Sequence, residues 1–162
     1  MTFEMKKIRA AGKGELYAEL LSQARGLLHD EHDLVANAAN FSALLYHGLP
    51  DLNWVGFYFM KGGELLVGPF QGKPACVHIA LGKGVCGTAA ETRQTQLVPD
   101  VNKFPGHIFC DGDSLSELVV PLIDGGKVLG VLDLDSPKLA RFDQEDKAGL
   151  EALARVFLES LQ

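Results

Sequence analysis

The sequence predicts an α+β fold in which an antiparallel β-sheet is covered by N-terminal helices and by a C-terminal helix. Apolar residues recur at helical spacing before residue 50 and after residue 143, whereas the region between them consists of short apolar runs. Two of the breaks between these runs carry paired glycines, Gly62-Gly63 and Gly125-Gly126, which are typical of hairpins between antiparallel strands. Helices at both ends of a run of antiparallel strands indicate the α+β class.

The N-terminal helical segment, residues 1–50, is expected to form two helices. In the first helix the apolar positions are Leu16, Leu20, Leu21, Ala24 and Leu27, with Gly26 near the end. Asp33 is the expected N-cap of the second helix, which Gly48 and Pro50 close. The apolar positions of this second helix are Leu34, Ala38, Phe41, Leu44 and Leu45.

The sheet and its loops are expected to occupy residues 51–140. The predicted strands cover residues 54–60, 65–67, 76–79, 96–98, 118–123 and 128–132. A Gly-rich loop and a short Ala-rich helix separate the third of these from the fourth. The C-terminal helix, residues 143–161, should begin at an Asp143 cap, and one of its faces carries Leu150, Leu153, Phe157 and Leu161. Because no linker or repeat interrupts this order, residues 1–162 are predicted to be a single domain.

Composition narrows the class of protein. The 162 residues are 47% hydrophobic and 22% charged, which is ordinary for a globular domain. A net charge of −6 without a run of Lys and Arg argues against nucleic acid and against an anionic membrane as the main partner. The N-terminus leads into no apolar signal core, and no stretch is long enough to span a membrane. We therefore expect a cytoplasmic protein.

The 3 cysteines are an odd number and do not resemble a secreted disulfide framework. Cys110 lies in the polar, Gly-rich stretch Gly106-His107-Ile108-Phe109-Cys110-Asp111-Gly112-Asp113-Ser114, where core packing does not require a cysteine. A thiol in such a loop can act as a nucleophile if its surroundings favour the thiolate.

Two other motifs could indicate a dinucleotide site and a zinc site, but each lacks the sequence context that such a site requires. Gly82-Lys83-Gly84-Val85-Cys86-Gly87 matches the dinucleotide pattern G-x-G-x-x-G, but that site needs a parallel βαβ unit, whereas the hairpin signals are antiparallel. We expect this loop to shape a ligand cavity with its backbone. Cys76 and His78, together with His107 and Cys110, could in principle bind zinc, but their spacing is not that of zinc knuckles. His78 is better explained as an exposed strand residue, and no metal is expected.

Carboxylates gather at one end of the predicted sheet. Asp133 and Asp135 are two apart in a strand and therefore share a face, which suggests a negative site for a cation on a ligand. Glu117 begins the partner strand. A plain two-residue turn would place Glu117 on the opposite face, whereas a one-residue bulge, for example at Pro121, would bring it to the face of the aspartates. Trp54 is either a core anchor or the wall of an apolar pocket to which it offers its indole N–H.

These residues together resemble the free methionine-(R)-sulfoxide reductases, enzymes of the GAF fold. The resemblance covers the chain from about the second helix to its end, and the cysteines together with the carboxylates are its most specific part. The matching segments are Asn53-Trp54-Val55-Gly56-Phe57-Tyr58, Gly68-Pro69-Phe70-Gln71-Gly72, Ala75-Cys76, Gly82-Lys83-Gly84-Val85-Cys86-Gly87-Thr88-Ala89, Val98-Pro99-Asp100-Val101, Phe104-Pro105-Gly106-His107-Ile108, Cys110-Asp111, Ser116-Glu117-Leu118-Val119-Val120-Pro121 and Gly130-Val131-Leu132-Asp133-Leu134-Asp135-Ser136.

The resemblance implies a role for each cysteine. Cys110 would attack the sulfoxide, Cys76 would resolve the resulting sulfenic acid as a disulfide, and Cys86 would be a secondary cysteine. Trp54, Glu117, Asp133 and Asp135 match the residues of the substrate pocket. Because a sulfoxide must be protonated or polarised before a thiolate attacks it, Glu117 could supply the proton, while the aspartates hold the substrate ammonium.

The resemblance further implies reduction of free methionine-(R)-sulfoxide without a bound cofactor, with thioredoxin supplying the electrons. It is compatible with a homodimer. The competing hypothesis is a non-catalytic GAF module that binds a small molecule or senses redox state, and a zinc-binding structural protein is a more distant third. A chain without an output domain disfavours the sensor.

Overall fold

The computed structural model describes residues 3–108 and 110–162, and within them one antiparallel sheet has the strand order β3-β2-β1-β6-β5-β4. The strands are β1 (Trp54–Lys61), β2 (Glu64–Gly72), β3 (His78–Ile79), β4 (Gln96–Val98), β5 (Ser116–Asp124) and β6 (Lys127–Ser136). The helices are α1 (Lys13–Leu27), α2 (Leu34–Gly48), α3 (Gly84–Thr92) and α4 (Gln144–Ser160), with a 3₁₀ turn at Val101–Lys103. The predicted α+β class with an antiparallel sheet is confirmed.

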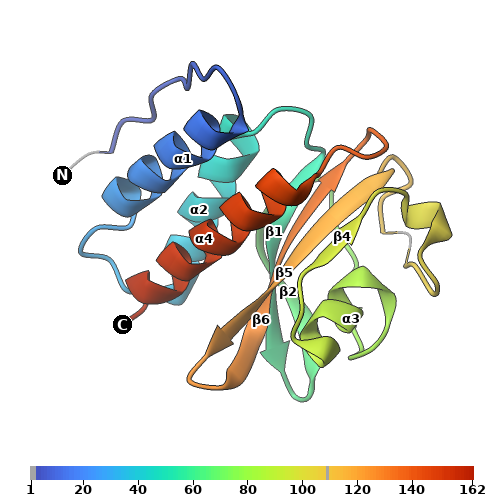
Figure 1. Ribbon diagram of the computed structural model, residues 1–162. Coiled ribbons are helices and arrows are strands. Elements are labelled where there is room, and N and C mark those ends of the chain that lie inside the picture. The colour runs from blue at the N-terminus through green and yellow to red at the C-terminus, as the bar shows by residue number, and fades with distance from the viewer. Residues whose placement is uncertain (1–2, 109) are drawn as a thin grey trace.

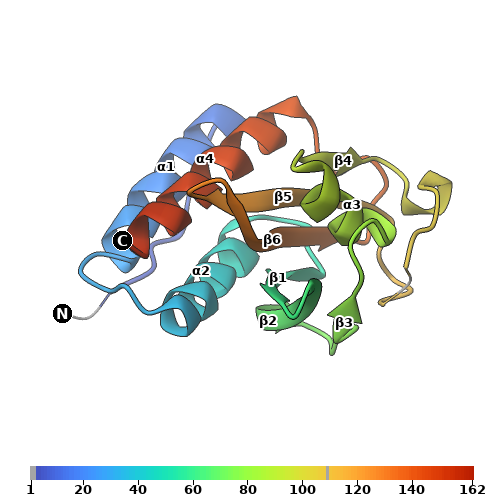
Figure 2. The ribbon, with the colours of Figure 1, turned by 90° about the horizontal axis from the view of Figure 1, so that it is seen from below.

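The two faces of the sheet are covered differently. Helices α2 and α4 lie against one face with α1 packed on the outside of these two, while α3 and the long loop before β5 lie on the other (Figures 1 and 2). Strand alternation explains this division, because Phe57 enters the core beneath α2 and α4, whereas the neighbouring Tyr58 points to the α3 side. On the helical side, the ring of Phe57 packs 4.5 Å from that of Phe157, centroid to centroid.

The helix caps explain where two of the helices begin. The side chain of Asp33 accepts a hydrogen bond from the backbone N–H of Ala36 at 2.8 Å, so α2 starts where it was predicted to start. Asp143 and Asp146 form a reciprocal capping box at the start of α4, which confirms the predicted cap. Helix α1 continues one residue past Gly26 and ends at Leu27.

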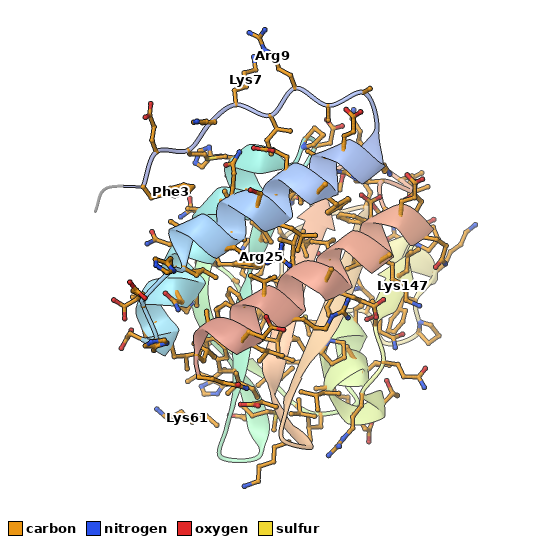
Figure 3. The ribbon with its side chains drawn as sticks, turned by 60° about the vertical axis from the view of Figure 1, so that its left-hand side comes forward. Phe3, Lys7, Arg9, Arg25, Lys61 and Lys147 are labelled. Atoms are coloured by element: carbon orange, nitrogen blue, oxygen red, sulfur yellow. A yellow bond between two sulfur atoms is a disulfide. The ribbon has the colours of Figure 1, made fainter. Side chains whose placement is uncertain are left out.

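A buried carboxylate joins α1 to α4. Asp146, with no exposed side-chain surface, accepts hydrogen bonds from Lys13 at 2.6 Å and from the Tyr17 hydroxyl at 2.7 Å, and it pairs with Arg141 at 3.3 Å. The two helices lie side by side, with the N-terminal arm running past α1 (Figure 3). A side chain at Gly149 would collide with the ring of Tyr17, so glycine is needed there for the helices to approach closely.

The sheet departs from the predicted strands at two places. Strand β2 extends through Gly68 and Pro69, because a register shift against β1 absorbs these residues instead of ending the strand. Strand β3 is only His78–Ile79, so Cys76 and Val77, which were predicted to begin this strand, precede it in the connection from β2. None of the helices in the described part of the chain is both long and apolar enough to cross a membrane.

The register of the β5–β6 hairpin contains one bulge. Leu122 faces Gly130 but Ile123 faces Val128, so Leu129 is the extra residue and the bulge lies on β6. The suggested position at Pro121 was therefore wrong. Because β4 pairs with β5 only from Glu117 to Val119, Pro121 has one neighbouring strand in the described sheet, and its missing N–H need not disturb the ladder.

Candidate active site

A cavity opens on the α3 side of the sheet, between strands β1, β6 and β5 and the segments that carry the cysteines. The lining side chains that bear on the chemistry are Trp54, Tyr58, Cys86, Cys110, Glu117, Asp133 and Asp135. The space open to the centre of a water molecule is about 50 Å³, and one water needs roughly 10–15 Å³ on the same measure. A dinucleotide does not fit in this volume, and α3 begins inside the glycine motif at Gly84 without a parallel strand before it.

Cys76 and Cys110 are joined by a disulfide, although 34 positions separate them in the sequence. Their Cα atoms are 5.4 Å apart, which is within the usual range for a cross-link. Cys110 is among the residues that line the cavity, whereas Cys76 is not, and it lies in the segment between β2 and β3. Both residues are partly exposed. Phe109, which belongs to the loop motif noted in the sequence, lies outside the described residues.

Polar contacts hold the part of the loop that follows Cys110. The side-chain amide of Asn53 donates to Asp111 at 3.1 Å and to the hydroxyl of Ser114 at 3.0 Å. Lys73 pairs with Asp113 at 2.8 Å and so ties this loop to the segment that carries Cys76. Because this ion pair is exposed, its contribution to stability is small, about 0–1 kcal/mol.

The register brings Glu117 and the aspartates together. Asp135 lies opposite Glu117 on β5 and opposite Trp54 on β1, so these three side chains form one row across the sheet. Asp133 occupies the next row on the same face, opposite Gly56. Glu117 and Asp133 are each only 5% exposed, and Asp135 is half-buried.

Burial makes this cluster hold protons. Desolvation raises the pKa of Glu117 well above its usual range, and the neighbouring aspartates raise it further. Burial and the charge of Asp133 likewise raise the pKa of Asp135. The pKa of Asp133 is raised by burial but less so, because hydrogen bonds from Glu117 and Cys86 stabilise its charged form. Asp133 is therefore the member that ionises most readily, and Glu117 is a buried acid that donates to it.

One carboxylate oxygen of the cluster accepts no hydrogen bond from the described residues. Among the described residues, the buried Oδ1 of Asp133 has no hydrogen-bond partner within the protein. A buried carboxylate oxygen without a partner costs free energy. Since Asp133 lines the cavity, a donor on a bound molecule could satisfy this oxygen.

Cys86 is a buried free thiol beneath the cavity. Burial raises the pKa of this thiol well above its usual range, and its S–H donates to Asp133. Its sulfur and one oxygen from each of Glu117 and Asp133 lie within 4.8 Å of one another. A metal would require all three groups to be deprotonated, and burial opposes that. Zinc at the other cysteines is no better supported, because both are oxidised and His78 pairs with Glu64 at 2.6 Å.

Two aromatic side chains form the wall opposite α3. Trp54 is 3% exposed and stacks on Tyr58 at 5.8 Å, but its indole N–H donates to the backbone carbonyl of Lys73 at 3.2 Å. That N–H therefore holds the Cys76 segment. Tyr58 was not predicted as a site residue, and its hydroxyl donates to the backbone carbonyl of Cys76 at 3.2 Å. The even spacing of Trp54, Gly56 and Tyr58 along one strand could have revealed it.

Comparison with known proteins identifies the family. The GAF domain model matches residues 15–158. The chain is 49% identical to the free methionine-R-sulfoxide reductase of Saccharomyces cerevisiae, over 91% of this chain and 87% of that one. It is also 49% identical to the free methionine-R-sulfoxide reductase of Escherichia coli, over 87% of this chain and 86% of that one. The chain belongs to the free methionine-R-sulfoxide reductase family.

A solved structure of a free methionine-R-sulfoxide reductase agrees with this assignment. The enzyme from Neisseria meningitidis, in complex with its substrate, superimposes on this structure with a TM-score of 0.94 and is 41% identical in sequence. The match covers 99% of this chain and 96% of the Neisseria chain. The resemblance noted in the sequence is therefore confirmed at the level of family and fold.

The buried acids of this family member should reduce the stability of its fold. Unfolded glutamate ionises near pH 4.3, whereas folded Glu117 keeps its proton to higher pH. As pH rises above about 4, the unfolded state loses this proton first, so stability falls until the folded group also ionises. Glu117→Gln copies the protonated form and should raise the free energy of unfolding at pH 7.5 by about 0.5–2 kcal/mol.

Urea unfolding at two pH values tests this prediction. The gain in Glu117→Gln should be present at pH 7.5 and nearly lost at pH 4, where Glu117 of wild type is mostly protonated in both states. Glu159→Gln, at an exposed position of α4, is the matched control and should change stability by less than about 0.5 kcal/mol at either pH. Equal stabilities of wild type and Glu117→Gln at pH 7.5 would contradict a raised pKa at Glu117.

Proposed function

We propose that this protein reduces free L-methionine (R)-sulfoxide to L-methionine, with Cys110 as the attacking thiol and Cys76 as the resolving thiol. The observation that carries the proposal is the disulfide between them, located beside a cavity that contains three buried or half-buried carboxyl groups. A ligand-binding module would need neither feature. The names of the relatives in yeast and Escherichia coli support the same reaction.

In the first half-reaction the thiolate of Cys110 attacks the sulfoxide sulfur. The sulfoxide oxygen must gain a proton as the S–O bond weakens, and Glu117 is the buried acid of the cavity that can donate it. The bond between the substrate sulfur and its oxygen breaks, the oxygen is transferred to the sulfur of Cys110 as a sulfenic acid, and methionine is released. The enzyme thiol is oxidised by two electrons, and the sulfoxide is reduced by two.

In the second half-reaction the thiol of Cys76 displaces the sulfenic oxygen of Cys110 as water and forms the disulfide. Two hydrogen bonds favour this step, because the Tyr58 hydroxyl and the Trp54 indole N–H donate to backbone carbonyls and so position the segment that carries Cys76. Cys86, buried and hydrogen-bonded to Asp133, is assigned a secondary role. Thioredoxin is the proposed reductant that returns the disulfide to two thiols.

Asp133 and Asp135 are the proposed partners of the substrate ammonium. The unpartnered Oδ1 of Asp133 supports this role, because an ammonium donor would satisfy it. The ammonium charge would also lower the pKa of both aspartates and so stabilise their ionised forms. A residue within a peptide has no such ammonium, so the site should prefer the free amino acid. The aromatic wall of Trp54 and Tyr58 would pack against the apolar part of the substrate.

Consumption of NADPH tests the proposed reaction. The purified protein is mixed with thioredoxin, thioredoxin reductase and NADPH, and the absorbance of NADPH is followed with and without free methionine sulfoxide. We expect NADPH oxidation that depends on the R epimer and yields an equal amount of methionine. If the protein binds methionine sulfoxide but neither NADPH nor dithiothreitol drives its reduction, the protein is a binding module instead.

The proposal extends to location and assembly. Recycling by a dithiol requires a reducing compartment, which supports the cytoplasm as the place of action. A homodimer is also proposed, and light scattering coupled to size-exclusion chromatography would test it.

A further inference from the structure

Apolar side chains are exposed in and next to the segments that the disulfide joins. Val77 is 50% exposed, Leu81 is 40% exposed and Ile108 is 36% exposed. Single exposed apolar residues are common on protein surfaces and need no explanation. Val77 follows Cys76 directly and Ile108 precedes Cys110 by two positions, so these two lie in the segments that the disulfide joins, and Leu81 lies in the turn after β3.

Strand geometry places Val77 on the cavity side of the sheet. Its backbone carbonyl accepts a hydrogen bond from the N–H of Val67 at 2.9 Å, so the chain at Val77 runs along β2. Side chains two apart share a face, and Ile79 is buried on the α3 side. Val77 therefore points to that side too, directly after Cys76, but remains exposed.

Leu81 and Ile108 both lie at the Gly-rich loop, since Leu81 directly precedes Gly82 and Ile108 packs on Gly84. Leu81 lies in the turn between Ile79 and Lys83, and both of these neighbours line the cavity. The side chain of Ile108 lies over Gly84, only 3.1 Å from the place where a Cβ of Gly84 would be. We name Val77, Leu81 and Ile108 the apolar rim.

We propose that the apolar rim is the docking surface for the protein dithiol that reduces the disulfide, and that this partner attacks the sulfur of Cys76. The inference rests on the proposed function, because only an enzyme that cycles through this disulfide needs such a partner. A small thiol can reach a partly exposed disulfide without a docking surface. A protein that presents its own cysteine must exclude water around the two sulfurs, which requires apolar contacts on both sides.

The position of the sulfurs supports attack at Cys76. Cys110 lines the cavity, whereas Cys76 does not line it, is partly exposed, and directly precedes the exposed Val77. Attack at Cys76 therefore approaches from the rim and releases Cys110 as a thiolate facing the cavity, where the next substrate binds.

The exchange balances in two steps. A thiolate of the partner forms a mixed disulfide with Cys76 and breaks the bond to Cys110, which leaves as a thiolate. The second thiol of the partner loses its proton, attacks the mixed disulfide and expels Cys76, which takes up a proton. The partner is oxidised to a disulfide, and two electrons pass to the enzyme.

Comparing a small dithiol with thioredoxin as the reductant distinguishes a defect in protein docking from a defect in the reaction with methionine sulfoxide. The variants Val77→Asp and Leu81→Asp are assayed with free methionine sulfoxide, once with dithiothreitol and once with thioredoxin, thioredoxin reductase and NADPH. Neither residue lines the cavity, so turnover with dithiothreitol should match wild type. The kcat/KM for thioredoxin should fall at least about tenfold, since a charge would be buried in the contact. The matched control Val35→Asp changes an apolar residue that is 63% exposed on α2, on the other face of the sheet, and should affect neither assay.

Each outcome bears on a different claim. If wild type reduces methionine sulfoxide with neither reductant, the proposed function fails. If dithiothreitol supports turnover and the rim variants keep the full rate with thioredoxin, the docking surface is wrong although the proposed function stands. A thioredoxin variant without its second cysteine should trap a mixed disulfide, which peptide mass spectrometry should locate at Cys76. A trapped link to Cys110 would overturn the assigned point of attack.

Discussion

Replacing Cys110 by serine is expected to abolish turnover of free methionine sulfoxide. A hydroxyl remains protonated at neutral pH and does not attack a sulfoxide sulfur, so the loss should exceed about 10⁴-fold, the scale seen when a nucleophile is removed. Because Cys110 is partly exposed in a loop, the variant should fold and bind substrate. Methionine release, measured with dithiothreitol or thioredoxin as reductant, gives the activity, and calorimetric titration gives the affinity. Retained activity would contradict the assignment of Cys110 as the nucleophile.

Cys76→Ser is the matched control, because it removes the same disulfide and leaves the proposed nucleophile in place. Formation of the sulfenic acid precedes resolution, so this variant should release about one methionine per enzyme in a single turnover and then fail to cycle with thioredoxin. Any difference between the two variants cannot come from the lost cross-link. In oxidised wild type, peptide mapping should find Cys76 linked to Cys110, and a dominant link between Cys86 and Cys110 would reverse the roles of the accessory cysteines.

The fold could be predicted from the sequence where local signals decide the structure. The Asp33 and Asp143 caps place the starts of α2 and α4 because cap chemistry depends on a few neighbouring residues. Strand β2 was predicted too short, because Gly68 and Pro69 signal a break when they are considered locally. The pairing with β1 absorbs them in a register shift, and that effect depends on a strand elsewhere in the sheet.

The site could be predicted only in part for the same reason. Asp133 and Asp135 were expected on one face because strand periodicity is local. The position of Glu117 depends on the bulge at Leu129, and one residue more or less reverses the face of the strand. The hydrogen bonds from Trp54 and Tyr58 to the segment of Cys76 join residues 18 and 19 positions apart, and no periodicity encodes such contacts.

The carboxyl cluster is expected to favour substrate binding but to lower the free energy of unfolding. Burial opposes charge on Glu117, Asp133 and Asp135, so these groups keep protons that the charge of a cationic ligand would displace. Sites of this kind commonly trade stability for activity. The gain expected on binding an ammonium group is the basis for discrimination between free and peptide-bound methionine sulfoxide, because a substrate without that group leaves buried carboxylates unpaired.

Asp133→Asn and Asp135→Asn are each expected to lower kcat/KM for free methionine sulfoxide by tenfold or more. A charge-assisted hydrogen bond contributes about 1.5–3 kcal/mol, and each variant removes one charge that faces the ammonium. N-acetylated methionine sulfoxide should be a poor substrate of wild type and should lose little further in either variant. Asp124→Asn, at the exposed end of β5, is the control and should leave the use of both substrates unaffected. If wild type used the free and acetylated substrates equally well, the aspartates would not be an ammonium site.

Glu117→Gln should act on a different step and slow turnover even at saturating substrate. The amide can donate to Asp133 and Asp135 as the protonated acid does, so substrate affinity should change little, but it cannot release a proton to the sulfoxide oxygen. General acid catalysis contributes roughly 10²–10⁴-fold, and kcat should fall on that scale.

In wild type, single-turnover rates should decline as the pH rises through the raised pKa of Glu117, because the donor is then ionised. In Glu117→Gln this decline should be absent, since the amide does not titrate. A variant more stable at pH 7.5, but with a slow and pH-independent chemical step, is the combination that a purely structural Glu117 would not produce.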